Sequence, residues 1–174
     1  RDVAPSRGLG DVYKRQFLRR VEADRPADVE AMHRCYQCPE VHRYTQGRAF
    51  RLEEWPEIIR GWEMERQKGG FIRWGIALTG DGALIGGIYL YRNDGKVFLG
   101  YLLHPAYWGN GYAFEAVNLV KRYAFTEWNI KALHASVDRR NFASIRLLKR
   151  SDFCCLESQP DEEIYVCNHF YEQA

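Results

Sequence analysis

The sequence predicts an α/β protein built on a mixed β-sheet of six or seven strands with helices on both faces. Two observations lead to this fold class. Segments of period-2 and period-3.6 hydrophobicity follow one another in the order β-α-α-β-β-β-α-β-α-β-β. In addition, residues 96–104 are apolar on both faces, which is typical of a strand at the centre of a sheet. A chain of 174 residues fits one domain, which we expect to span residues 17–174.

Residues 1–16 are expected to lie outside this domain. The run RDVAPSRGLGDVYKRQ does not begin with Met and has no sustained helix or strand period. It resembles the adapter-derived translations found at the ends of metagenomic gene fragments, and the alternative is an ordinary flexible terminus. In either case we expect this run to be dispensable for folding.

The first half of the expected domain begins with a strand over residues 17–22. Asp24 is the expected N-cap of a first helix, with Pro26 in its first turn, where a missing N–H costs little. Pro39 ends that helix, and a second helix covers residues 52–68.

The remaining elements follow from alternation, turn residues and helical spacing. Gly80-Asp81-Gly82 and Asn93-Asp94-Gly95 separate three strands, and the second of these turns is a strong hairpin signal. The expected elements are strands over 71–79, 83–91 and 96–104, a helix over 111–128, a strand over 133–138, a helix over 141–149, and strands over 153–157 and 164–170.

Charge and cysteine usage exclude several classes of protein. The net charge is only +2 with both signs interspersed, which argues against nucleic-acid binding. No apolar run approaches the roughly 20 residues of a membrane span, and no signal-peptide order is present, so we expect a cytoplasmic protein. Five cysteines do not form a disulfide framework, and the lone Cys35-x-x-Cys38 pair does not predict a metal site. Cys154 and Cys155 are expected on opposite faces of a strand, within the core.

The most informative segment is the loop between the buried strand and the long helix. Gly109 and Gly111 lie where the strand ends and the helix begins, so unpaired N–H groups converge there and an anion can approach them closely. An NTPase P-loop is excluded because no Lys-Ser or Lys-Thr follows the glycines. A dinucleotide-binding fingerprint is excluded because Phe114 stands where its third glycine is needed.

Two linked motifs carry a family resemblance. The run from Leu99 to Ala116 (LGYLLHPAYWGNGYAFEA) resembles the acetyl-CoA-binding motif of GNAT N-acetyltransferases, in the form typical of the Rim-type (RimJ/RimL-like) branch. The block from Ala135 to Phe153 resembles the next motif of that superfamily, and Pro39-Glu40-Val41 also fits. The resemblance covers residues 17–171. It implies the GNAT fold, a splayed mixed sheet that holds acetyl-CoA in the splay.

The resemblance also implies how this chain holds acetyl-CoA. The pantetheine arm is expected to bond to the backbone of Leu102 and Leu103, with Asn141 beside it and Ser144 near the thioester sulfur. The pyrophosphate is expected on the N–H groups at the start of the helix. The residues assigned to this part of the cofactor site are Trp108, Gly109, Asn110, Gly111, Tyr112 and Ala113.

Two departures from the family pattern bear on catalysis. Ala106 replaces the Gln or Arg that usually begins the loop motif. Leu148 occupies the position where many members carry a Tyr that protonates the leaving thiolate. Ser144 is then the best remaining hydrogen-bond donor to the sulfur.

The general base stays open between three residues. His104, Glu115 and His134 are the candidates, since no acidic residue lies on the central strand. His134 can equally be a satisfied buried histidine, and Glu115 a first-turn residue that complements the helix dipole. An α-amino acceptor, with a pKa of about 7.7–8.0, can also lose its proton to water.

The acceptor is less defined than the cofactor. The Rim-type resemblance favours a protein N-terminal α-amine, for example that of a ribosomal protein. A small amine such as a polyamine, amino acid or aminoglycoside is the alternative, and a non-catalytic acetyl-CoA-binding module is a third reading. We expect no metal and a monomer or homodimer. The aromatic residues Tyr44, Trp55, Trp62, Trp74, Tyr89 and Tyr101 can line an acceptor groove, although their periodicity favours the core for most of them.

Overall fold

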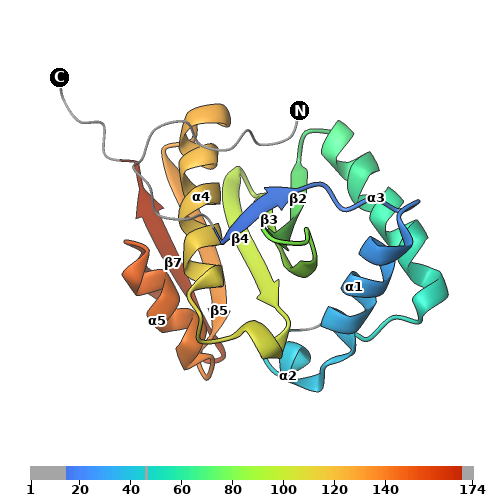
Figure 1. Cartoon of the computed structure of the whole chain (residues 1–174). Coiled ribbons are helices and arrows are strands. Elements are labelled where there is room, and N and C mark those ends of the chain that lie inside the picture. The colour runs from blue at the N-terminus through green and yellow to red at the C-terminus, as the bar shows by residue number, and fades with distance from the viewer. Residues whose placement is uncertain (1–14, 46, 170–174) are drawn as a thin grey trace.

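The computed structural model describes residues 15–45 and 47–169. Figure 1 shows the arrangement of the elements along the chain. The strands are β1 (Gln16–Arg19), β2 (Phe71–Leu78), β3 (Leu84–Asn93), β4 (Lys96–Leu103), β5 (Ala132–Asp138), β6 (Cys154–Ser158) and β7 (Glu162–Asn168). The helices are α1 (Pro26–Gln37), α2 (Pro39–His42), α3 (Trp55–Gln67), α4 (Tyr112–Glu127) and α5 (Phe142–Arg150), with 3₁₀ turns at Leu52–Glu54 and Pro105–Tyr107.

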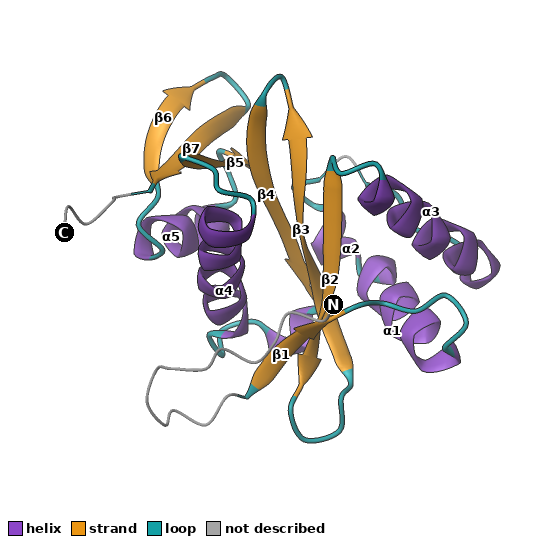
Figure 2. Cartoon of the chain, turned by 90° about the horizontal axis from the view of Figure 1, so that it is seen from above, coloured by secondary structure: helices purple, strands orange, loops and turns teal. Residues whose placement is uncertain are grey.

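The described strands form one seven-stranded sheet in the order β1-β2-β3-β4-β5-β7-β6. Neighbouring strands are antiparallel except β4 and β5, which are parallel. The predicted mixed sheet is confirmed, and β4 occupies its centre as its two apolar faces require. Figure 2 shows α4 and α5 on one side of the sheet and α1 and α3 on the other.

Each face of the sheet has its own hydrophobic core. Between the sheet and α4, the core includes Trp74, Ile88, Leu99 and Val117. A smaller cluster under α1 and α3 is centred on Met32 and Trp55, which are fully buried. Among the described residues, no helix is both long and apolar enough to cross a bilayer.

The first strand begins one residue before the expected domain boundary. Gln16 starts β1, its side chain is buried, and its Nε2 donates to the Tyr112 carbonyl at 2.6 Å. The Arg15 carbonyl accepts from the Thr79 N–H at 3.0 Å. Both positions are therefore hydrogen-bonded into the sheet region, although they lie within the run 1–16 that is expected to be dispensable. Thermal melting of the chain without residues 1–16 tests that expectation. Residues 1–14 lie outside the described residues.

Two local predictions were wrong, and one short helix was not predicted. Cys154 and Cys155 are exposed, because β6 is the edge strand and no described helix covers it. The N-cap position of α1 is Arg25 rather than Asp24, whose carboxylate accepts from Arg60 instead. The four-residue helix α2 had no periodic signal to predict it, because it is little longer than one turn.

The β3–β4 pair is close-packed at Gly86. A Cβ atom at this position would lie 2.3 Å from the Leu102 carbonyl oxygen and 2.9 Å from the Leu103 Cα. Gly86→Ala is therefore expected to lower the free energy of unfolding by about 1–3 kcal/mol, because backbone atoms must move apart. Gly80→Ala is the matched control, since no heavy atom lies within 4 Å of its added Cβ. Urea denaturation tests the prediction, and equal midpoints for the two variants would contradict it.

Candidate active site

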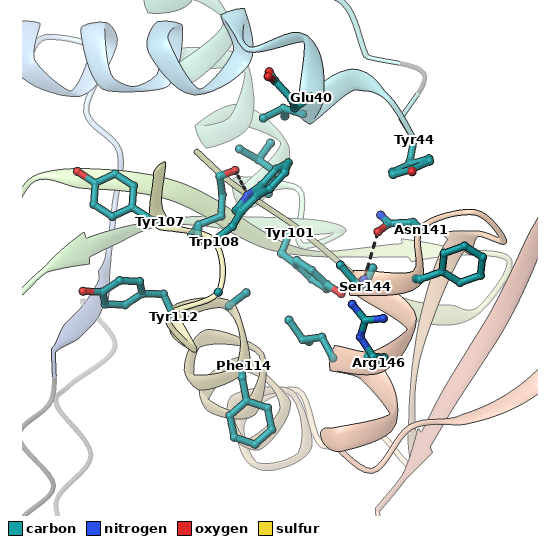
Figure 3. A pocket seen from close by; sticks show the side chains of 18 of the residues that line it. Glu40, Tyr44, Tyr101, Tyr107, Trp108, Tyr112, Phe114, Asn141, Ser144 and Arg146 are labelled. Carbon is teal, nitrogen blue, oxygen red and sulfur yellow. Dashed lines mark hydrogen bonds between the residues drawn. The ribbon is translucent and has the colours of Figure 1, made fainter. Parts of the chain in front are cut away.

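A pocket of about 660 Å³ lies where β4 separates from β5. The parallel register joins only Val97 to Leu133 and Phe98 to His134, so the two strands diverge beyond these pairs. The pocket is lined by the end of β4, the start of α4, one face of α5, and α2 with the residues that follow it. Figure 3 shows these side chains around the pocket.

The start of α4 supplies unoccupied N–H groups to this pocket. Gly109 and Gly111 have φ values of +75° and +83°, which glycine adopts without the cost that a Cβ imposes. The α4 N-cap is Gly111, and no side chain in the described part of the chain caps the helix, so its first N–H groups stay available to an anion. The exposed ring of Trp108 is fixed by its Nε1–H, which donates to the Leu103 carbonyl at 2.8 Å.

The backbone of β4 presents alternate residues to the gap. The His104 N–H donates to the Ile85 carbonyl of β3 at 2.8 Å. Going back along β4 from His104, the backbone N–H and C=O groups of successive residues therefore point alternately away from β3 and toward it. Leu103 and Tyr101 point their N–H groups toward the gap, whereas Leu102 points its backbone groups toward β3. The available backbone donors at this edge therefore belong to Leu103 and Tyr101 rather than to Leu102.

A hydrogen-bonded group of side chains connects α5 to β4. Asn141 caps α5 by accepting from the Ser144 N–H at 3.2 Å. The Ser144 hydroxyl lies 2.5 Å from the Tyr101 hydroxyl, and both residues line the pocket (Figure 3). Burial raises the pKa of Tyr101 to about 12, so this phenol stays protonated across the neutral and moderately alkaline range.

The pocket brings most of the predicted site residues together. Those that line it are Leu102, Leu103, Trp108, Gly109, Gly111, Tyr112, Ala113, Asn141 and Ser144. Asn110 is not among the lining residues, because its side chain turns back to donate to the Trp108 carbonyl at 3.0 Å.

Two of the three predicted catalytic residues, His104 and Glu115, do not line the pocket. His104 faces the end of α1: its Nδ1 accepts from the Ala106 N–H at 3.2 Å, and its Nε2 lies 3.4 Å from the Cys38 Sγ. Glu115 pairs with Arg15 beside β1. The prediction that either residue serves as base is not supported by its position.

His134 is a buried, hydrogen-bonded histidine, which is the alternative that the sequence left open for it. Its ring is buried, and Nδ1 lies 3.3 Å from the Val97 carbonyl oxygen. Burial lowers the pKa of His134, which keeps the ring neutral near pH 7.

Several pocket residues were not predicted from the sequence. Tyr101 was named only as a residue that can line an acceptor groove, and its contact with Ser144 was not predicted. Arg146 and Arg150 on α5 line the pocket at helical spacing i, i+4, a signal that was available in the sequence. Leu148, at the position of the usual Tyr, is buried in the core instead of lining the pocket.

The comparison with protein families decides the assignment. The family model of the acetyltransferase (GNAT) domain matches residues 15–154. The chain belongs to the GNAT acetyltransferase family. It is 32% identical over 130 residues to the uncharacterized N-acetyltransferase YoaA of Bacillus subtilis (strain 168), which covers 72% of this chain and 73% of YoaA.

Solved structures share this GNAT fold at low identity. RimL, a ribosomal alpha-N-protein acetyltransferase, superposes with a TM-score of 0.77 at 15% identity, over 91% of this chain and 93% of RimL. The microcin self-immunity acetyltransferase MccE, solved with acetyl-CoA and AMP, gives a TM-score of 0.77 at 14% identity, over 90% of this chain and 93% of MccE. As a member of the GNAT acetyltransferase family, the protein is an acyltransferase that uses acetyl-CoA. Within residues 15–45 and 47–169, no group of three or more His, Cys, Asp or Glu side chains could hold a metal ion.

Proposed function

We propose that this GNAT enzyme acetylates the N-terminal α-amine of a protein, and that it belongs to the RimJ/RimL-like branch. The observation that carries the proposal is the single pocket in which the start of α4, the open edge of β4 and the Tyr101–Ser144 pair meet. The motif of the Rim-type branch and the fold shared with RimL support this acceptor class. The five cysteines are free, which fits a reducing compartment such as the cytoplasm.

In the proposed pose, acetyl-CoA lies along the gap beside β4. The N–H groups from Gly109 to Ala113 would hold the pyrophosphate, because a helix N-terminus without a side-chain cap favours negative charge. Arg146 and Arg150 would add positive charge on the α5 side of the pocket. The pantetheine amides would bond to the gap-facing backbone of Leu103 and Tyr101, as an added strand would.

The residues of the pocket would then support direct attack by the amine on the thioester. The Leu103 N–H would donate to the acetyl oxygen as negative charge develops there. Ser144, held by Asn141 and Tyr101, would donate a hydrogen bond to the sulfur as the carbon–sulfur bond breaks. The leaving group is a thiolate whose conjugate acid has a pKa of about 8.5, so a hydrogen bond suffices without full proton transfer. The proton that the attacking nitrogen loses as the amide forms would pass to water.

The lining residues favour an α-amine over a lysine side chain. Among the described residues, no histidine lines the pocket, and Glu40 supplies its single carboxylate. An α-amine, with a pKa of about 7.7–8.0, is partly neutral at physiological pH, whereas a lysine near 10.4 needs a strong base close by. The proposed site therefore suits the more weakly basic acceptor.

An acetyl-transfer assay across acceptor classes tests the proposed function. Release of free CoA thiol is measured with N-terminal peptides, lysine peptides blocked at the α-amine, polyamines and aminoglycosides. The proposal expects the highest kcat/KM with an unblocked peptide. A higher value with a polyamine or aminoglycoside would favour the small-amine function. If none of the acceptors causes release of CoA, a non-catalytic binding module is favoured.

The pH profile of kcat provides a separate check on Tyr101. A tyrosine donates only while protonated, so a pKa raised to about 12 keeps this donor intact as pH rises. We expect no decline in kcat between about pH 8 and pH 10 from loss of the phenol proton. Tyr101→Phe should therefore lower kcat by the same factor at both ends of this range. A factor that shrinks as pH rises would show that Tyr101 ionises earlier.

A further inference from the structure

The charged residues of the pocket divide it into two ends. Arg146 and Arg150 lie on α5, on the side that receives the phosphates in the proposed pose. Glu40 and Arg43 lie on and just after α2, and Figure 3 shows Glu40 and Tyr44 across the pocket from Phe114 and Arg146. This second group, Glu40 with Arg43, is here called the α2 rim. It lies on the side left for the acceptor.

Glu40 is the only acidic residue that lines the pocket, and its carboxylate has no ion-pair partner among the described residues. Arg43 follows at i+3, a spacing at which this chain forms ion pairs elsewhere. Glu63 pairs with Arg66 at 2.5 Å, and Glu57 pairs with Arg60 at 3.6 Å. At the α2 rim the same spacing leaves both charges separate, so each can meet a charge of the acceptor.

The other cation at this end is already neutralised. Arg140 lines the pocket but binds Asp138 through two hydrogen bonds of 2.9 and 2.7 Å. This pairing lowers the pKa of Asp138 to about 2, so the carboxylate remains charged beside the guanidinium. Within residues 15–45 and 47–169, the acceptor end therefore presents one negative and one positive charge without an ion-pair partner, at Glu40 and Arg43.

We propose that the α2 rim selects an acceptor with a single ammonium group followed closely by a negative charge, namely a peptide N-terminus with an acidic second residue. This rests on the proposed function. Glu40 binds the α-ammonium before it loses its proton, and Arg43 binds the acidic side chain. A polyamine or a peptide with a basic second residue would instead meet Arg43 as a like charge, which disfavours it.

The test compares three alanyl peptides that differ only in their second residue, which is aspartate, asparagine or lysine. The native enzyme is expected to show the highest kcat/KM with aspartate and the lowest with lysine. Arg43→Gln should remove most of the advantage of aspartate over asparagine, an effect of about fivefold for an exposed charge pair. Glu40→Gln should raise KM for all three peptides by a similar factor.

Two further measurements separate this role from a structural one. Calorimetric affinity for acetyl-CoA should be unchanged in Glu40→Gln, because the phosphate contacts lie at the other end of the pocket. Glu57→Gln is the matched control: it removes an exposed helical glutamate that does not line the pocket, and it should leave KM unchanged.

The outcomes distinguish this inference from the proposed function. If peptides are acetylated but the second residue has no effect, or lysine is preferred, the α2 rim assignment is wrong and the function stands. If polyamines are acetylated and no peptide is, both fail. If no amine is acetylated, peptide binding to the CoA-bound protein is measured by calorimetry, and equal affinity for the aspartate and lysine peptides overturns the inference.

Discussion

Ser144→Ala is expected to lower kcat ten- to a hundredfold while leaving the affinity for acetyl-CoA nearly unchanged. One hydrogen bond to a developing charge contributes roughly 1.5–3 kcal/mol, which corresponds to this range in rate. The Ser144 hydroxyl lies 2.5 Å from the Tyr101 hydroxyl, and the pocket of about 660 Å³ is open beside both. The pyrophosphate contacts are proposed at the start of α4, so the substitution should affect kcat rather than binding.

Tyr101→Phe is the companion change, and it tests whether the phenol acts through the serine. If the Tyr101 hydroxyl donates to Ser144, the serine is left with its own proton for the sulfur. The double variant should then be only slightly slower than Ser144→Ala alone, because residues that act as a unit have non-additive effects. If the losses of kcat in the two single variants multiply in the double variant, Tyr101 contacts the reacting atoms independently of Ser144.

A turnover limited by product release would hide these effects. Single-turnover measurement of acetyl transfer isolates the chemical step and is the assay to use. Full activity of Ser144→Ala in that assay would mean that the thiolate leaves unaided and that the serine only supports the start of α5. Asn118→Ala is a suitable control, since it removes a polar side chain that bonds to α4 and Ser151 outside the pocket.

The sequence predicted the position of the central strand β4 better than that of the edge strand β6. The two apolar faces of β4 predicted its central position, because only a strand covered on both sides can bury both sets of residues. Alternation alone could not place Cys154 and Cys155, which lie on an edge strand that is exposed along its length. An edge strand and a central strand can have the same alternation of residues, and they differ only in which elements pack against them.

In the candidate site too, local features could be predicted from the sequence, whereas contacts between distant segments could not. The loop from Trp108 to Ala113 was predictable because glycines at a strand–helix junction indicate backbone with positive φ. Gly109 and Gly111 both have positive φ. The Tyr101–Ser144 contact spans 43 residues, and no spacing rule relates a strand residue to a helix that follows three elements later. The sequence left the base open between His104, Glu115 and His134, because it places these residues along the chain but does not give the direction of their side chains. In the structure His104 and Glu115 lie outside the pocket lining.

Gly111→Val is expected to weaken acetyl-CoA binding at least tenfold, or about 1.4 kcal/mol. Gly111 is the N-cap of α4 at φ +83°, and it lines the pocket where the phosphates are proposed. A branched side chain would occupy that space, and it would also pull the backbone away from a left-handed conformation that costs non-glycine residues about 1–2 kcal/mol. Both effects misdirect the N–H groups that hold the anion, so calorimetry with acetyl-CoA should detect the loss directly.

The strain on the backbone needs a control of its own. Gly82 has φ +72°, no heavy atom lies within 4 Å of its added Cβ, and it does not line the pocket. Gly82→Val should therefore lower the melting temperature about as much as Gly111→Val does, while its affinity for acetyl-CoA stays at the native value. Equal losses of affinity in both variants would trace the effect to general destabilisation. Native affinity in Gly111→Val would place the phosphates elsewhere, because valine disfavours the left-handed backbone at this N-cap.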